Sequence, residues 1–128
     1  MLLSAWATMK VLIIEPNAPH AASLASISRA LGHQPIVCGD PTEAIQTADE
    51  SSPGLILLGL SIQGLDIYKY ARVLREQDDL AGVKIVAVSG EVDDPHRARE
   101  AGIDVELLRP YSRGILPVLR ENLHMEAH

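Results

Sequence analysis

The sequence predicts a single α/β domain built on a parallel β-sheet with helices on both of its faces. Four short apolar runs and a weaker fifth are separated by segments long enough to hold a helix. Two of the runs, Val11–Ile14 and Leu55–Leu58, are apolar at every position, which is typical of strands covered on both sides. The 128 residues suffice for one domain with one sizeable core, and no second domain is expected.

The five apolar runs give the expected strands in chain order. They are Val11–Ile14, Ile36–Cys38, Leu55–Leu58, Ile85–Val88 and Val105–Leu108. Glu106 interrupts the last run, as expected of an edge strand. Cys38 is the one cysteine, so it forms no intrachain disulfide, and we expect a small buried side chain at the end of the second strand.

Helices are predicted between the strands from apolar spacing and from capping residues. Leu24, Ile27 and Leu31 recur at helical spacing, and Gly32 is the expected C′ residue. The pair Asp40-Pro41 predicts an N-cap and first residue for the second helix. A third helix is predicted from about Ile67 to Gln77, with Tyr70 and Leu74 on one face. A fourth is predicted from about Pro95 to Ala101, and Gly102 can end it. A fifth is expected to begin near Ile115, because Gly114 and Pro117 weaken an earlier start.

Composition excludes several classes of function. The formal net charge of −6 argues against a nucleic-acid-binding face, which requires clustered basic residues. No run approaches the roughly 18 apolar residues needed to cross a bilayer, and the start lacks a basic signal-peptide region. We therefore expect a cytoplasmic protein without membrane contact.

The chain is expected to divide into an N-terminal extension (1–8), the domain (9–123) and a tail (124–128), with Met1 or Met9 as the native start.

The most informative residue is Gly59, which ends the third apolar run. The stretch Leu55-Ile56-Leu57-Leu58-Gly59-Leu60-Ser61-Ile62-Gln63-Gly64-Leu65-Asp66 closely resembles the sequence around the phosphorylated aspartate of bacterial response-regulator receiver domains of the chemotaxis-regulator type. Gly59 stands in the place of that aspartate. The resemblance covers Lys10 to about Leu123, and it implies a flavodoxin-like, doubly wound fold with five strands in the order 2-1-3-4-5 and five helices.

The resemblance also implies a site at the carboxyl ends of the strands. Active receivers carry two acids after strand one, the phosphorylated aspartate after strand three, Ser or Thr after strand four, and Lys before proline after strand five. This chain has Glu15 and Pro16, then Gly59, then Ser89, and then Arg109 at those positions. Ser89 alone matches cleanly, so the resemblance implies a degenerate phosphorylation site.

Chemistry explains why these differences act together. Aspartyl phosphorylation needs a carboxylate nucleophile and a Mg²⁺ ion that neutralises the developing charge. Glu15 with a backbone carbonyl near Ser61 is a poor site for a cation that demands six oxygen ligands. We expect weak or absent Mg²⁺ binding, no other cofactor and no catalysis.

Two further expectations concern the end of the fifth strand. Arg109 is predicted to pair with Glu15 across the strand ends. The resemblance implies a cis peptide bond before Pro110, since receivers commonly carry one there. Asp66 is expected to be exposed near a helix start and not to act as an acceptor. The histidines lack metal-ligand spacing and are expected at the surface.

The leading functional hypothesis is a stand-alone pseudo-receiver in bacterial two-component or phosphorelay signalling, which acts by protein–protein contact without aspartyl phosphorylation. Expected partners are signalling proteins, such as a histidine kinase or another regulator, or a second copy of the chain. In receivers the surface of helix four, strand five and helix five commonly carries such contacts. Here that surface comprises His96, Arg97, Arg99, Glu100, Glu106 and Ile115, and Glu106 replaces the family's usual aromatic switch residue.

Two alternatives remain. One is a phosphorylatable response regulator with a non-standard acceptor. The other is a flavodoxin-like domain that binds a small ligand, although no glycine-rich phosphate loop follows the first strand, where Glu15-Pro16-Asn17-Ala18-Pro19 stands instead.

Overall fold

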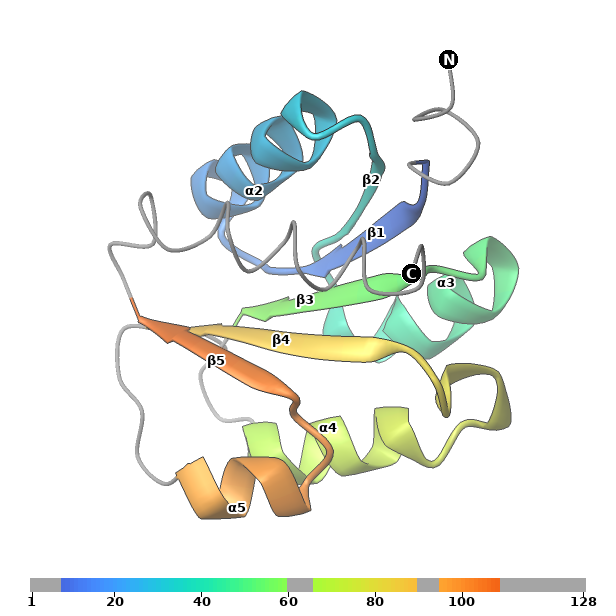
Figure 1. The fold of residues 1–128 in the computed structure, drawn as a ribbon, viewed down its shortest axis with the longest axis vertical. Coiled ribbons are helices and arrows are strands. Elements are labelled where there is room, and N and C mark those ends of the chain that lie inside the picture. Colours follow the sequence, from blue (N-terminus) through green and yellow to red (C-terminus); the bar gives the residue numbers. More distant parts are fainter. Residues whose placement is uncertain (1–7, 60–65, 90–94, 109–128) are drawn as a thin grey trace.

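A parallel β-sheet lies at the centre of the computed structural model, which describes residues 8–59, 66–89 and 95–108 (Figure 1). Its strands have the order β2-β1-β3-β4-β5. The predicted α/β fold and the order 2-1-3-4 are confirmed, and the last strand pairs in parallel with β4. The strands are β1 (Lys10–Ile14), β2 (Gln34–Cys38), β3 (Leu55–Gly59), β4 (Lys84–Ser89) and β5 (Val105–Leu108).

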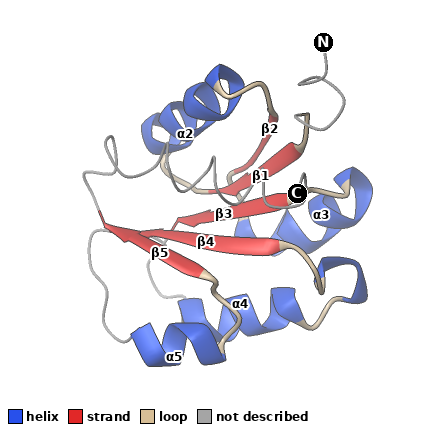
Figure 2. Cartoon of the chain, viewed as in Figure 1, coloured by secondary structure: helices blue, strands red, loops and turns tan. Residues whose placement is uncertain are grey.

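Helices cover both faces of the sheet, with α2 on one side and α3, α4 and α5 on the other (Figure 2). The predicted fifth helix, from Ile115, lies outside the described residues. Among these residues, no helix has the length and apolar character to span a bilayer. The helical segments are α2 (Ala18–Ala30), η1 (Pro41–Glu43), α3 (Ala44–Ser51), α4 (Ile67–Arg75), η2 (Asp78–Leu80) and α5 (Pro95–Glu100).

Three predicted capping residues, Gly32, Asp40 and Gly102, lie at the ends of helical segments. Gly32 follows α2 with a φ of +86°, and Gly102 follows α5 with a φ of +95°, so both glycines adopt the left-handed conformation that ends a helix. The Asp40 side chain accepts the backbone N–H of Thr42, as an N-cap does. The first turn after Asp40 is the 3₁₀ turn η1, and α-helical geometry begins only at Ala44.

The prediction for α4 was wrong at its C-terminus, because the helix ends at Arg75 and not at Gln77. Gln77 has an extended backbone, with φ −72° and ψ 127°, and leads into the separate turn η2. The buried face of α4 consists of Tyr68, Ala71 and Leu74, while Tyr70 is half-buried. Tyr68 is therefore the more buried of these two tyrosines.

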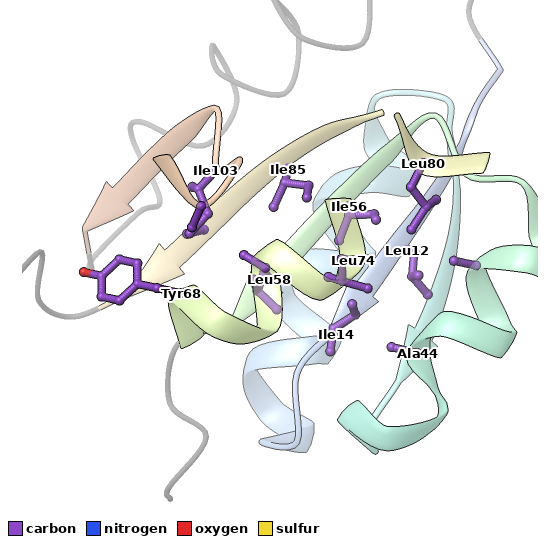
Figure 3. Close-up of a cluster of buried hydrophobic side chains, with 14 of the residues drawn as sticks. Leu12, Ile14, Ala44, Ile56, Leu58, Tyr68, Leu74, Leu80, Ile85 and Ile103 are labelled. Carbon is purple, nitrogen blue, oxygen red and sulfur yellow. The ribbon is translucent and has the colours of Figure 1, made fainter. Parts of the chain in front are cut away.

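The core is largely aliphatic, and it has two layers because successive strand residues point to opposite faces of the sheet. Figure 3 shows the layer beneath α3, α4 and α5, where Tyr68 adds a ring to the aliphatic side chains. The β3 residues Leu55 and Leu57 belong to the other layer, against α2. Every residue of β3 is buried, which confirms a strand covered on both faces.

Candidate functional site

Glu15 and Gly59 are brought together by the register of the two central strands. Ile14 pairs with Leu58, so the residues that follow them lie side by side at the carboxyl edge of the sheet. The Glu15 backbone N–H also donates to the Cys38 carbonyl, at 3.1 Å, which fixes the chain after β1 against the end of β2. The ends of three strands thus meet at Glu15.

The Glu15 side chain folds back into the protein, and only 2% of the residue is exposed. Its Oε2 accepts the backbone N–H of Asn17, at 3.0 Å. Its Oε1 lies 4.0 Å from Nδ1 of His20, in the first turn of α2. A buried carboxylate is costly without such partners, and a position beside a helix N-terminus favours negative charge. The start of α2 therefore holds this carboxylate in place.

The Glu15 carboxylate covers the Cα atom of Gly59. A Cβ atom added at Gly59 would lie 2.7 Å from Cδ and 3.2 Å from Oε2 of Glu15, and closer still to Oε1. Contacts below 3.0 Å force a neighbouring group to move. Sequence reasoning treated Gly59 as a residue without a side chain and Glu15 as a residual acid. It missed that the Glu15 side chain fills the space above Gly59. The signal available in the sequence was the adjacency of the first and third strands in the implied order.

The other residues of the predicted degenerate site are only partly described. Pro16 follows Glu15 and is exposed. Ser89 ends β4, where its backbone pairs with Leu108. Arg109 and Pro110 lie outside the described residues, so the predicted Arg109–Glu15 pair and the cis peptide bond remain predictions.

Of the residues at this edge, those that the structure describes do not fit a magnesium site. The side chains of Pro16 and Gly59 offer no ligand atom, and Glu15 Oε2 already accepts a backbone N–H. In the described ranges, no group of three or more His, Cys, Asp or Glu residues is arranged to hold a metal ion. A cation that requires six oxygen ligands is therefore poorly served by these residues.

The end of β2 is fixed by its own hydrogen bonds. Cys38 is buried, as predicted, and its thiol donates to the Asp40 carbonyl at 3.1 Å. Hydrogen bonds from the hydroxyl and the backbone N–H of Thr42 lower the pKa of Asp40. The Tyr70 hydroxyl donates to the Pro41 carbonyl at 2.6 Å, and burial raises the pKa of this phenol above its usual value. These contacts tie α4 to the loop that precedes α3.

The predicted partner face is exposed along α5. His96, Arg97, Arg99 and Glu100 are all accessible, and His96 Nε2 lies 2.7 Å from Oε1 of Glu100, one turn later. Glu106 is opposite Ala87 in the sheet register. Ile115 lies outside the described residues.

Arg97 differs from its neighbours on α5, because it reaches across to α4. Its guanidinium carbon lies 4.5 Å from the centre of the Tyr68 ring. Its Nη2 is 3.4 Å from Oδ2 of Asp66, while Oδ1 of Asp66 accepts the backbone N–H groups of Tyr68 and Lys69. Asp66 is thus the exposed N-cap of α4, as its expected position near a helix start requires. Arg97 connects this cap to α5.

The expectation of surface histidines is wrong for His33, which is 4% exposed. Its Nδ1 accepts the backbone N–H of Met9, at 3.1 Å, because the chain turns inward after Gly32 and places His33 beside the start of β1. His96 is exposed, and His20 is partly exposed beside Glu15.

Sequence reasoning also missed Arg75, at the end of α4. Its guanidinium donates to the carbonyls of Val83 at 2.6 Å, Gly102 at 2.7 Å and Leu80 at 3.0 Å. It also pairs with the Asp104 carboxylate at 3.0 Å, which in turn accepts the Ile85 N–H. Arg75 therefore joins the segments that lead into β4 and β5. No local pattern marks such a residue.

Comparison with known proteins finds similarity both in sequence and in fold. No family model matches it. It is 31% identical over 104 residues to the DNA-binding response regulator MtrA of Mycobacterium tuberculosis, a match that covers 80% of this chain and 44% of MtrA. The chain spans less than half the length of the curated relatives it matches.

Solved structures of the same fold cover nearly the whole chain. The chemotaxis protein CheY4 of Vibrio cholerae superimposes with a TM-score of 0.82 at 16% identity, over 90% of this chain and 98% of CheY4. The receiver domain of a sensor histidine kinase from Pseudomonas aeruginosa, solved with a magnesium ion in its active site cleft, gives a TM-score of 0.76 at 24% identity, over 93% and 97% of the two chains. The chain therefore has the CheY-like fold of response-regulator receiver domains, and its sequence is similar to a part of response regulators such as MtrA.

Proposed function

We propose that this chain is a pseudo-receiver, which acts in two-component or phosphorelay signalling by protein–protein contact and without aspartyl phosphorylation. A receiver domain is a signalling module and not an enzyme, so its function depends on its site and its partners. The observation that carries the proposal is the position of Glu15, whose carboxylate fills the space above Gly59. Gly59 therefore offers no nucleophile of its own, and Glu15 leaves no room for a side chain at that position.

The charges of the domain support contact with other signalling proteins. The net charge of −6 disfavours a nucleic-acid partner for this domain. The exposed residues of α5 carry both signs of charge, with Arg99 and Glu100 adjacent. A cytoplasmic histidine kinase, another regulator or a second copy of the chain is the kind of partner that this face fits.

Incubation of the purified chain with acetyl phosphate and Mg²⁺, followed by intact-mass measurement, tests the proposal. We expect no added phosphoryl group, whereas a receiver with an intact aspartate gains one under the same conditions. The Gly59→Asp variant is also expected to stay unmodified, because Pro16 still leaves the metal site without its second acid and Glu15 occupies the space.

A phosphoryl group on the wild-type chain would contradict the proposal and favour the alternative of a non-standard acceptor. The position of Glu15 above Gly59 makes it the first residue to examine. Peptide mapping together with the Glu15→Gln and Asp66→Asn variants would then identify the acceptor. Loss of the adduct in one variant alone would assign it.

The ligand-binding alternative has little support at this edge. A hollow of about 360 Å³ opens between α2 and the end of β2, next to Glu15. Alanine residues of α2 form much of its wall, and Val37 and Gly39 line the strand side. The polar residues of its lining are Glu15, Ser26 and Arg29, and Glu15 Oε2 already accepts the Asn17 N–H.

A further inference from the structure

We infer that Glu15 acts as an internal ligand of the receiver site, which means that its buried carboxylate occupies the space a side chain at position 59 would need. Glu15, which follows β1, and Gly59, which ends β3, thus form one unit. The regulatory meaning of this pair rests on the proposed function and deepens it. The contact between the Glu15 carboxylate and Gly59 closes the site. Position 59 has to be glycine because the Glu15 carboxylate leaves no room for a Cβ atom. Glycine at position 59 is then more than a missing aspartate.

Geometry supports the space-filling role of Glu15. Even the smallest side chain at position 59 would come within 2.7 Å of its Cδ atom. The flexible end of a side chain normally moves aside from such a clash at little cost, and exposed glutamates do so readily. Glu15 differs because it is 2% exposed and its carboxylate is already bound.

The surroundings of Glu15 oppose its displacement. Its Oε2 accepts the Asn17 N–H at 3.0 Å, and Asn17 is itself the N-cap of the 13-residue helix α2. Moving the carboxylate would break a charge-assisted hydrogen bond and withdraw negative charge from a helix N-terminus. A side chain at position 59 therefore disturbs the start of α2 as well as the end of β3.

A double-mutant cycle in thermal unfolding tests this coupling. Gly59→Ala alone is expected to lower Tm by roughly 4–10 °C, because it overpacks a filled site. In the Glu15→Ala background the same change is expected to be neutral or stabilising, since alanine is preferred to glycine within a strand. The loss in Tm caused by Gly59→Ala thus disappears or changes sign when the carboxylate is removed.

Further variants separate space from charge and protect the test against a misfolded mutant. Glu15→Gln keeps the shape of the side chain, so the penalty of Gly59→Ala should persist in that background. Glu15→Asp withdraws the carboxyl group by one methylene and should reduce the penalty even if Glu15→Ala fails to fold. Gly82→Ala, in the turn before β4, is the matched control, because no described heavy atom lies within 4 Å of a Cβ there, and it should change Tm equally in every background.

The inference is wrong if Gly59→Ala lowers Tm equally in the wild-type and Glu15→Ala or Glu15→Asp backgrounds. Its failure is distinct from failure of the proposed function. Equal losses in Tm together with no phosphoryl uptake would refute the role of Glu15 as an internal ligand and leave the pseudo-receiver proposal standing. Phosphoryl uptake by a chain in which the Tm loss depends on Glu15 would refute the pseudo-receiver proposal and leave the role of Glu15 standing.

Discussion

Replacement of Arg75 by alanine is expected to destabilise the domain more than any other arginine substitution on α4. The guanidinium joins the carbonyls of Leu80 and Val83, before β4, to that of Gly102, before β5. It also packs against Gly102, where an added Cβ would lie 2.9 Å from its Nε atom. The variant would free these carbonyls and remove the link between three segments of the chain.

The expected loss follows from these contacts. Each of the three close carbonyl bonds contributes about 1 kcal/mol, since part of the released hydrogen bonding is recovered by water. The Asp104 pair adds little, because 24% and 35% of the two side chains are exposed. The total is a loss of about 3 kcal/mol in the free energy of unfolding.

Urea denaturation followed by circular dichroism measures this loss. With a slope of about 1.5 kcal/mol per molar, the midpoint should fall by about 2 M. Arg75→Lys should recover only part of it, because one ammonium group cannot replace a planar fork with several donors. Arg72→Ala, on the exposed side of the same helix, is the control and should change the free energy by less than about 0.5 kcal/mol. Equal losses for Arg75→Ala and Arg72→Ala would refute the reasoning.

Two other substitutions give independent tests. Asp66→Ala removes the acceptor of two backbone N–H groups, so it should lower the free energy of unfolding, measured in urea, by about 1 kcal/mol. Asp66→Asn keeps most of the cap and should lose less. Equal losses for the two variants would contradict the capping role. The pKa of Asp79 is raised by a hydrogen bond with Asp49 and, to a smaller extent, by the charge of that carboxyl. The stability that Asp79 contributes is therefore fully present below its ordinary pKa of 3.8 and is lost as pH rises through the raised value. Asp79→Asn should therefore raise the urea midpoint at neutral pH and leave it unchanged below pH 3.8, and a difference independent of pH would overturn this assignment.

The elements that sequence alone could predict are those specified by short-range patterns. Continuous apolar runs identified the buried strands, because a strand covered on both faces needs apolar residues at successive positions. Gly32, Asp40 and Gly102 marked helix ends through backbone preferences that operate within a few residues. Cys38 was correctly expected to be buried at a strand end.

The features that sequence reasoning missed depend on residues far apart in the chain. His33 is buried because the chain turns inward beside Met9, 24 positions away. The end of α4 was misplaced because Gln77 leads into a separate turn, although its side chain would suit a helix. Arg75 has no local signature, since its partners extend to Gly102, 27 positions later.

The sequence by itself determined that this chain forms a parallel α/β domain and that glycine occupies the end of its third strand, since both follow from the order of residues. Only the tertiary structure decided what lies above that glycine. The pairing of Ile14 with Leu58 brings Glu15 beside Gly59, and the N-terminus of α2 holds the carboxylate there. Side-chain packing across strands depends on register and on neighbouring helices, and these arise only when distant segments come together.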